Sequence, residues 1–381
     1  MKVLERLVLR HLQSITKDKL DPCQFAYQAN RSVDDAVALA LHFILQQLDT
    51  PNRYARLLFV DYSSAFNTIV PMKLFDKLQI FDLSPSIRFW ILSFLLDRPQ
   101  IVRIGANFSQ PLVLSTGAPQ GCVLSPFLYC LYTNDCVCHH ESTQLVKFAD
   151  DTTVEGVISN GDETAYRQEV DCLVSWCKEN SLELNTSKTN EMIVDFRRNS
   201  TPIDPLVING QVIKTVDSFK FLGSLISSDL SWNTNTDSII KRAHQRLYFL
   251  RQLKKFGLSQ EILKQFYRAV VESVLTFSIT VWYGSASQQQ KARLDYLVRT
   301  AGKIVGSDLP SLDSIYVERL TKRARKIAAD SSHPGCHLFE LMPSGRRYRS
   351  LRSRTCRYHN SFFPQAVNAL SELMSNTHQS R

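Results

Sequence analysis

The stretch "QLVKFADDTTVEGVI", residues 144–158, decides the fold of this chain. Apolar and alternating residues run up to Ala149, the adjacent carboxylates of Asp150 and Asp151 follow, and a second alternating run leads to Ile158. This pattern predicts a buried hairpin with two acids at its tip. Like charges so close together raise each other's pKa, which costs stability unless a cation compensates. A divalent metal with oxygen ligands would compensate; the alternative is a surface turn in which the aspartates cap backbone amides.

A third acid, Asp61, ends the apolar run "RLLFVD" at residues 56–61. It lies 89 residues before Asp150, so only a sheet brings the two side by side. The antiparallel palm of a polymerase gathers acids in this way for two ions about 3.5–4 Å apart, which clamp the attacking and leaving oxygens of phosphoryl transfer. Asp61, Asp150 and Asp151 are therefore the candidate metal ligands.

Composition indicates a folded chain with more than one lobe. Its 381 residues are 44% hydrophobic, enough for a sizeable core, and 21% charged, an ordinary value for a globular protein. The nine cysteines are scattered without a CxxC pair and no signal peptide is recognisable, which predicts reduced thiols and a place in the nucleus and cytoplasm. The longest apolar run, at 274–282, is too short to cross a bilayer, so no membrane partner is expected.

The net charge of +9 is concentrated in one segment. Residues 319–357 hold eleven Lys and Arg against two acids, and without them the chain's 45 basic and 36 acidic residues fall to 34 each. Phe339, Tyr348 and Tyr358 lie among or beside these cations. Such a pattern is typical of a surface that contacts a phosphate backbone; the alternative is a solvated face or tail.

Periodicity and turn residues predict an α+β body followed by helices. Helical spacing and proline-led starts predict helices at 1–16, 32–48, 71–80, 85–97, 125–138 and 162–180. Strand patterns predict a strand at 56–61, a hairpin at 100–117, the hairpin around Asp150, a strand at 189–196 and short strands through 206–227. From Thr236 to about Lys326 the pattern is helical, which places the main boundary near residue 232.

Six motifs, in order, resemble those of the reverse transcriptases of non-long-terminal-repeat, LINE-like retrotransposons, and the "FADDTT" wording is closest to the vertebrate branches. The motifs are "LDPCQFAYQANRSVDDAV" (20–37), "FVDYSSAFNTI" (59–69), "STGAPQGCVLSPFLYCLYTND" (115–135), "VKFADDTTV" (146–154), "WCKENSLELNTSKTNEMIVDF" (176–196) and "FKFLGSLIS" (219–227).

The resemblance implies an α+β fold: a right-hand polymerase palm and fingers, made of an antiparallel sheet with packed helices, followed by a helical thumb-like and basic C-terminal region. It implies partial fingers at 1–55, the palm with the catalytic motifs at 56–231, a thumb-like region at 232–330 and a basic segment at 331–381. Members of the family carry further fingers sequence upstream, so an N-terminally truncated chain is expected.

The same resemblance implies RNA-directed DNA polymerase activity. The 3′-hydroxyl of a DNA primer, in this family nicked target DNA, attacks the α-phosphate of a dNTP on an RNA template. Two Mg²⁺ ions, for which Mn²⁺ can substitute, would be held mainly by Asp61 and Asp150, with Asp151 the weaker third ligand.

The resemblance also implies contacts with the nucleotide and template. Phe66 would lie under the nucleotide's sugar and leave no room for a 2′-hydroxyl, or be a plain core aromatic. Gln120 and Gly121 belong to a glycine-containing loop that approaches a base pair closely, or forms an ordinary turn. Asn67 stands where many relatives have aspartate and is expected to matter little, because its side chain would face away from the metals.

Further roles follow from the remaining motifs. Lys188 would protonate or neutralise the departing pyrophosphate, or be a solvated lysine. Arg31 would touch the triphosphate or the template. Phe221, Leu222 and Gly223 would hold the primer, form a core hairpin, or do both.

Three alternatives remain open. A non-catalytic nucleic-acid-binding remnant would keep the palm and the basic segment without turnover, and Gln28, where many relatives have arginine, removes charge from the triphosphate pocket. A group II intron maturase is a related enzyme that the motif wording argues against. Finally, an H-x2-C and C-x2-H spacing is compatible with zinc; it involves His333, Cys336, Cys356 and His359.

Overall fold

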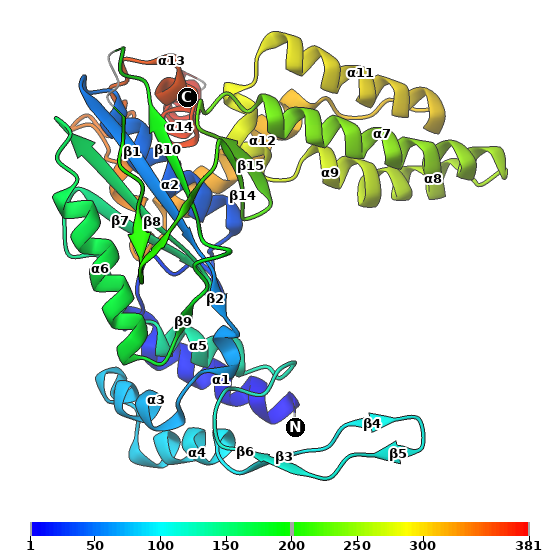
Figure 1. The fold of residues 1–381 in the computed structure, drawn as a ribbon. Helices are drawn as coiled ribbons and strands as arrows, with labels where there is room; N and C mark the ends of the chain where they lie inside the picture. The colour runs from blue at the N-terminus through cyan, green and yellow to red at the C-terminus, as the bar shows by residue number, and fades with distance from the viewer. Residues whose placement is uncertain (1, 199–201, 380–381) are drawn as a thin grey trace. The chain divides into compact units, whose positions relative to one another are not determined.

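The computed structural model describes residues 2–198 and 202–379, which form two compact units (Figure 1). Unit 1 comprises Met1–Ser32, Arg56–Glu191 and Thr201–Thr215. Unit 2 comprises Val33–Ala55, Met192–Ser200 and Val216–Arg381. Each unit is therefore assembled from three separate stretches of the chain.

The main sheet has five strands in the order β13-β10-β1-β8-β7. Their bounds are Lys214–Thr215, Asn190–Asp195, Arg53–Val60, Asp151–Ser159 and Thr143–Phe148, respectively. β7 and β8 form the expected antiparallel hairpin, and β10 pairs with β13 in parallel at the edge. β1 is buried along almost its whole length: the apolar residues 57–60 are buried as the sequence predicts, and Arg56 is buried in ion pairs with Glu163 and Glu191. The sheet with its packed helices confirms the α+β class.

Five α-helices belong to unit 1 in the described residues: α1 (Lys2–Thr16), α3 (Pro71–Lys77), α4 (Pro85–Leu95), α5 (Ser125–Tyr132) and α6 (Thr164–Glu179). Proline occupies the first turn of α3, α4 and α5, where its missing N–H is no loss. α6 approaches β8 so closely that a Cβ on Gly156 would lie 2.3 Å from the Tyr166 ring. Short 3₁₀ turns follow at Lys17–Lys19, Ala65–Asn67 and Leu78–Phe81.

The prediction that the helix after Ser125 runs to about residue 138 is wrong, because α5 ends at Tyr132. The carbonyls of Thr133 and Cys136 accept hydrogen bonds from the buried Lys147 Nζ at 2.7 and 2.8 Å. Those carbonyls are turned toward the lysine, so the helix does not continue through them.

Small two-stranded sheets complete unit 1. β3 (Arg98–Gln100) pairs with β6 (Leu112–Leu114), β4 (Arg103–Ile104) with β5 (Asn107–Phe108), β2 (Tyr62–Ser63) with β9 (Glu183–Leu184), and β11 (Val207–Ile208) with β12 (Gln211–Val212). The β3–β6 segment is the hairpin expected at 100–117, drawn in cyan in Figure 1.

Unit 2 is mostly helical and carries one hairpin, β14 (Ser218–Phe221) with β15 (Ser224–Ser227). Its longer helices are α2 (Val33–Leu48), α7 (Asn233–Lys255), α11 (Gln288–Val305), α12 (Leu312–Ala328) and α14 (Phe362–Gln379). Its shorter ones are α8 (Gln260–Phe266), a π-helix at Tyr267–Glu272, α9 (Ser273–Leu275), α10 (Ile279–Trp282), 3₁₀ turns at Tyr283–Ser285 and Cys336–Leu338, and α13 (Cys356–His359). The helical pattern expected for 236–326 is confirmed.

The C-terminal segment is part of the unit 2 core. α14, which charge patterning did not predict, packs on α2 and α12 with Phe362, Phe363 and Val367 buried. The exposed arginines between residues 346 and 357 come before α14. No helix in the described residues is long and apolar enough to cross a membrane.

Candidate active site

The two adjacent aspartates lie at the tip of the β7–β8 hairpin. Phe148 pairs with Asp151 across the closing position, which leaves Ala149 and Asp150 as the two turn residues. Ala149 takes a left-handed conformation with φ +58°. Asp150 and Asp151 are both exposed to solvent, and the Thr152 hydroxyl donates to the Asp150 carbonyl at 3.3 Å. The turn therefore presents two carboxylates at one end of the sheet.

Asp61 belongs to the same end of the sheet. It directly follows β1, the neighbour of β8, on which Asp151 is the first residue. Its amide donates to the Thr189 hydroxyl at 3.2 Å, and its carbonyl accepts from the Asn185 amide at 2.8 Å. The pKa of the Asp151 carboxyl is raised by partial burial, then by the charges of Asp150 and Asp61. The charges of all three carboxylates therefore act on one another at this end of the sheet.

The chemistry of this trio suits hard divalent cations, because it consists of carboxylate oxygens whose mutual repulsion such an ion offsets. In residues 2–198 and 202–379, no three His, Cys, Asp or Glu side chains converge closely enough to enclose an ion by themselves. A bound ion would therefore need further oxygen ligands, such as phosphate or water.

Phe66 lies in the 3₁₀ turn that follows Asp61 and is half-buried. Its ring centroid is 4.8 Å from that of Tyr129. The pKa of the Tyr129 hydroxyl is raised well above its usual value, mainly by burial and next by the charge of Asp150. Tyr129 therefore packs against the Phe66 ring, and its hydroxyl is close enough to the Asp150 carboxylate to be affected by its charge.

The loop at residues 117–121 is held against the Phe66 turn. The Gly117 amide donates to the Ile69 carbonyl at 2.7 Å, and the Ala118 amide donates to the Phe66 carbonyl at 2.9 Å. Gly117 has φ +73°, and a Cβ there would lie 2.8 Å from the Asn67 Cα, so only glycine fits.

Gln120 and Gly121 are exposed in this loop, and the Gln120 side chain has a hydrogen-bond partner in the Phe66 turn. Its Nε2 donates to Asn67 Oδ1 at 3.1 Å. The expectation that Asn67 matters little overlooked this contact. No local sequence signal marks it, because the partners are 53 residues apart.

Lys188 is exposed in the turn between Asn185 and Thr189, the two residues that hydrogen-bond the Asp61 backbone. The turn that carries Lys188 is therefore attached to the backbone of Asp61. Arg31 lies half-buried in the loop before α2, where its guanidinium is 3.4 Å from the Asn30 carbonyl. Its role at a triphosphate stays a prediction.

The expected primer-holding residues belong to unit 2, whereas the three aspartates belong to unit 1. Phe221 is buried, while Leu222 and Gly223 form the β14–β15 turn with φ values of +45° and +89°. A Cβ on Gly223 would lie 2.8 Å from the Phe277 ring. These contacts fit the core-hairpin interpretation, and primer holding stays a prediction.

Three of the four residues of the zinc spacing have other side-chain contacts, and the fourth, Cys356, is an exposed free cysteine. His333 Nδ1 accepts from the Gly335 amide at 3.0 Å, and His333 Nε2 is 3.7 Å from Asp35. Cys336 Sγ contacts the Ala328 carbonyl at 3.7 Å, and His359 Nδ1 lies 3.3 Å from the Ser353 hydroxyl. Within the described part of the chain no metal-binding group forms from them.

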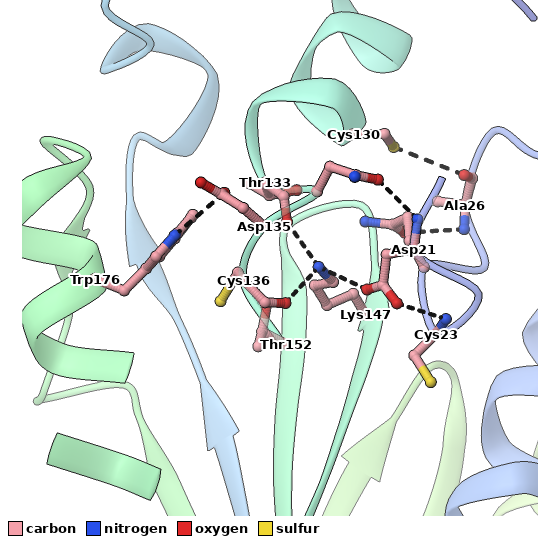
Figure 2. A network of polar contacts seen from close by, with 12 residues as sticks. Asp21, Cys23, Ala26, Cys130, Thr133, Asp135, Cys136, Lys147, Thr152 and Trp176 are labelled. Carbon is pink, nitrogen blue, oxygen red and sulfur yellow. Dashed lines mark hydrogen bonds and ion pairs between the residues drawn. The ribbon is translucent and has the colours of Figure 1, made fainter. Parts of the chain in front are cut away.

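Sequence reasoning missed Lys147, a lysine buried to 1% exposure in β7. Its Nζ pairs with Asp21 Oδ2 at 2.8 Å and donates to the Thr133 and Cys136 carbonyls, as Figure 2 shows. The signal was a single lysine inside the apolar run "LVKFA", where a buried cation requires a buried acid.

A sheet whose neighbouring strand ends carry three aspartates, beside a close-packed glycine loop, defines a polymerase palm. The family model described as "Reverse transcriptase (RNA-dependent DNA polymerase)" matches residues 1–226, more than half of the chain. The chain belongs to that reverse transcriptase family. A second model, "Alkylated DNA repair protein alkB homolog 8, N-terminal", matches only residues 232–273.

Curated relatives come from mobile elements. The chain is 27% identical over 323 residues to "Probable RNA-directed DNA polymerase from transposon BS" of Drosophila melanogaster. The aligned region covers 81% of this chain and 35% of the relative. The chain is 23% identical over 326 residues to "RNA-directed DNA polymerase from mobile element jockey" of the same species, covering 80% and 34%. The chain thus spans about a third of the length of these relatives.

Among solved structures, apo telomerase from Candida tropicalis matches with a TM-score of 0.46 and 14% identity over 86% of this chain and 54% of that one. Telomerase from Candida albicans matches with a TM-score of 0.41 and 14% identity, over 87% and 57%.

Proposed function

We propose that this chain acts as the RNA-directed DNA polymerase of a non-long-terminal-repeat retrotransposon, extending a DNA primer on an RNA template. Family membership supports the reaction class. The observation that carries the proposal is the shared electrostatic environment of Asp61, Asp150 and Asp151 at neighbouring strand ends. The vertebrate type remains an inference from the "FADDTT" wording.

In this proposal the three carboxylates hold two Mg²⁺ ions, or Mn²⁺ in their place. When bound, the ions supply charge stabilisation at the α-phosphate and lower the pKa of the primer hydroxyl. Asp61 and Asp150 are the principal ligands, and Asp151 adds negative charge whose repulsion the ions relieve.

The surrounding residues orient the nucleotide. Phe66 closes the space next to the sugar 2′ position, and its packing on Tyr129 supports that placement. Gln120, held by Asn67, presents the exposed loop with Gly121 to the template base pair. Lys188 stands on the segment bonded to Asp61, which suits a cation that meets the departing pyrophosphate.

Partners follow from the same reaction: an RNA template, a nicked DNA target as primer, and dNTPs, met in the nucleus and cytoplasm. The division into partial fingers at 1–55, palm at 56–231, thumb-like region at 232–330 and basic segment at 331–381 remains a proposal beside the two compact units.

We also propose that the cations of 319–357 contact the nucleic-acid backbone. Ten of the eleven are exposed. The exception, Arg323, pairs with Asp35 at 2.8 Å and lies 3.8 Å over the Phe362 ring, so it stabilises the core of unit 2. The exposed ones are Arg319, Lys322, Arg325, Lys326, Arg346, Arg347, Arg349, Arg352, Arg354 and Arg357.

The decisive test is primer extension on an RNA template with Mg²⁺ or Mn²⁺. Asp150→Asn should abolish nucleotide addition and leave the unfolding temperature equal or slightly higher, because a like-charge repulsion is removed. Asp171→Asn, an exposed aspartate of α6, is the matched control and should leave activity unchanged. A wild-type chain that binds template and primer without extending would favour the non-catalytic remnant.

A further inference from the structure

Part of the loop before α2 lies alongside the end of β7. Gln24 and Lys147 form a parallel bridge. The Phe25 amide donates to the Lys147 carbonyl at 2.8 Å, and the Lys147 amide donates to the Cys23 carbonyl at 2.9 Å. Residues 23–25 are therefore in register with the strand that leads to the catalytic turn.

The Gln24 side chain reaches beyond this bridge to Ala149, the residue before Asp150. Its Oε1 accepts from the amides of Ala149 and Ala26, both at 3.0 Å, and its Nε2 donates to the Ala149 carbonyl at 3.3 Å. Gln24 is only 2% exposed. One buried amide thus satisfies both backbone groups of Ala149.

Ala149 needs such support because it has φ +58°. The left-handed region costs an alanine roughly 1–2 kcal/mol, since its Cβ crowds the following carbonyl. A residue held there against its preference sets the direction in which the next side chain leaves the backbone. The next side chain is Asp150.

The loop itself is firmly anchored. Asp21 Oδ2 pairs with Lys147 Nζ, Asp21 Oδ1 accepts from the Cys23 amide at 3.0 Å, and the Asp21 amide donates to Asn134 Oδ1 at 2.7 Å. Figure 2 shows Lys147 surrounded by Asp21, Thr133 and Cys136. The hydrogen bonds of Gln24 therefore attach the β7–β8 turn to an anchored loop. We call this attachment the brace.

We propose that Gln24 is a positioning residue of the polymerase: it holds Ala149 left-handed so that the Asp150 carboxylate faces its metal ligand position. This inference rests on the proposed function for its effect on turnover. The brace itself is a property of the fold and is measurable without activity.

The test compares Gln24→Met, which keeps the shape but removes all three hydrogen bonds, with Gln168→Met on the exposed face of α6. We expect kcat to fall roughly ten- to hundredfold, as for a catalytic group displaced by about 1 Å, with the KM for dNTP and template nearly unchanged. Adding Ala149→Gly should recover much of kcat, because glycine takes the left-handed turn without the Cβ cost. Unchanged kcat in folded Q24M, or no recovery with glycine, overturns the proposal.

Amide hydrogen exchange separates this inference from the proposed function. Q24M should accelerate exchange at Ala149 and Ala26 relative to Gln168→Met, whether or not the chain extends a primer; equal rates refute the brace. If Q24M does not fold, Gln24→Asn takes its place, since its side chain is one methylene shorter and its amide no longer reaches Ala149. A folded Q24N with unchanged kcat and unchanged exchange at Ala149 also refutes it.

Discussion

Glu155 lies in the middle of β8, four residues after Asp151, and is fully buried. Its Oε2 is 3.4 Å from Gln144 Nε2, and its Oε1 has no hydrogen-bond partner within the described residues. Burial raises the pKa of this carboxyl from its usual 4.5 to about 8. We predict that Glu155→Gln stabilises the protein at alkaline pH.

The sign follows from proton binding. Between pH 4.5 and 8 the folded carboxyl keeps a proton that the unfolded chain releases, so the free energy of unfolding falls as pH rises. From this group alone, the loss between pH 6 and pH 8 is roughly 2 kcal/mol, equivalent to about 4–8 °C in Tm for a domain of this size. Glutamine has no such titration and keeps the shape of the neutral acid.

The assay is thermal unfolding of both proteins at pH 6, 7 and 8. The difference in Tm between the variant and the wild type should widen steadily with pH. Glu179→Gln, an exposed glutamate at the end of α6, is the matched control and should give a constant difference. A gap between Glu155→Gln and wild type that stays constant or narrows toward pH 8 would refute the reasoning.

Three further predictions concern the site and the surface. Phe66→Val should raise the rate of ribonucleotide relative to deoxynucleotide incorporation, measured in single turnovers; an unchanged ratio in a folded protein would contradict the role at the sugar. Gly117→Ala should cost at least ~1–2 kcal/mol in chemical denaturation, because φ is +73° and the Cβ meets the Asn67 backbone; a neutral effect would show that the loop moves freely. The third change neutralises three exposed arginines, Arg346, Arg347 and Arg352. It should flatten the slope of log affinity against log salt for duplex DNA by up to about 3, at roughly 0.9 per contact. An unchanged slope would mean that these arginines are only solvated.

Deleting residues 319–381 is not a clean test, because the structure places parts of α12 and all of α14 from this range in the core of unit 2. α12 contributes Leu320 and Ile327 to the buried interior, and α14 contributes Phe362 and Phe363. Charge patterning identified the cations but gave no sign of this burial, because it counts charges and not the apolar residues that lie between the cations in α12 or after residue 361 in α14.

By itself, the sequence determined the local elements and the chemical type of the site. Alternation around Asp150 marked β7 and β8, the prolines marked the starts of α3 and α4, and the apolar run before Asp61 marked a buried strand. These features are readable because backbone periodicity and proline geometry act over a few residues.

The tertiary structure alone decided which distant groups meet. The end of α5 depends on Lys147, the support of Ala149 depends on Gln24, and Gln120 is held by Asn67. Each of these contacts joins residues from different elements, up to 125 positions apart, and satisfies a polar group. No local pattern encodes such a partnership, because a polar group removed from water requires a partner but does not specify where in the chain that partner lies.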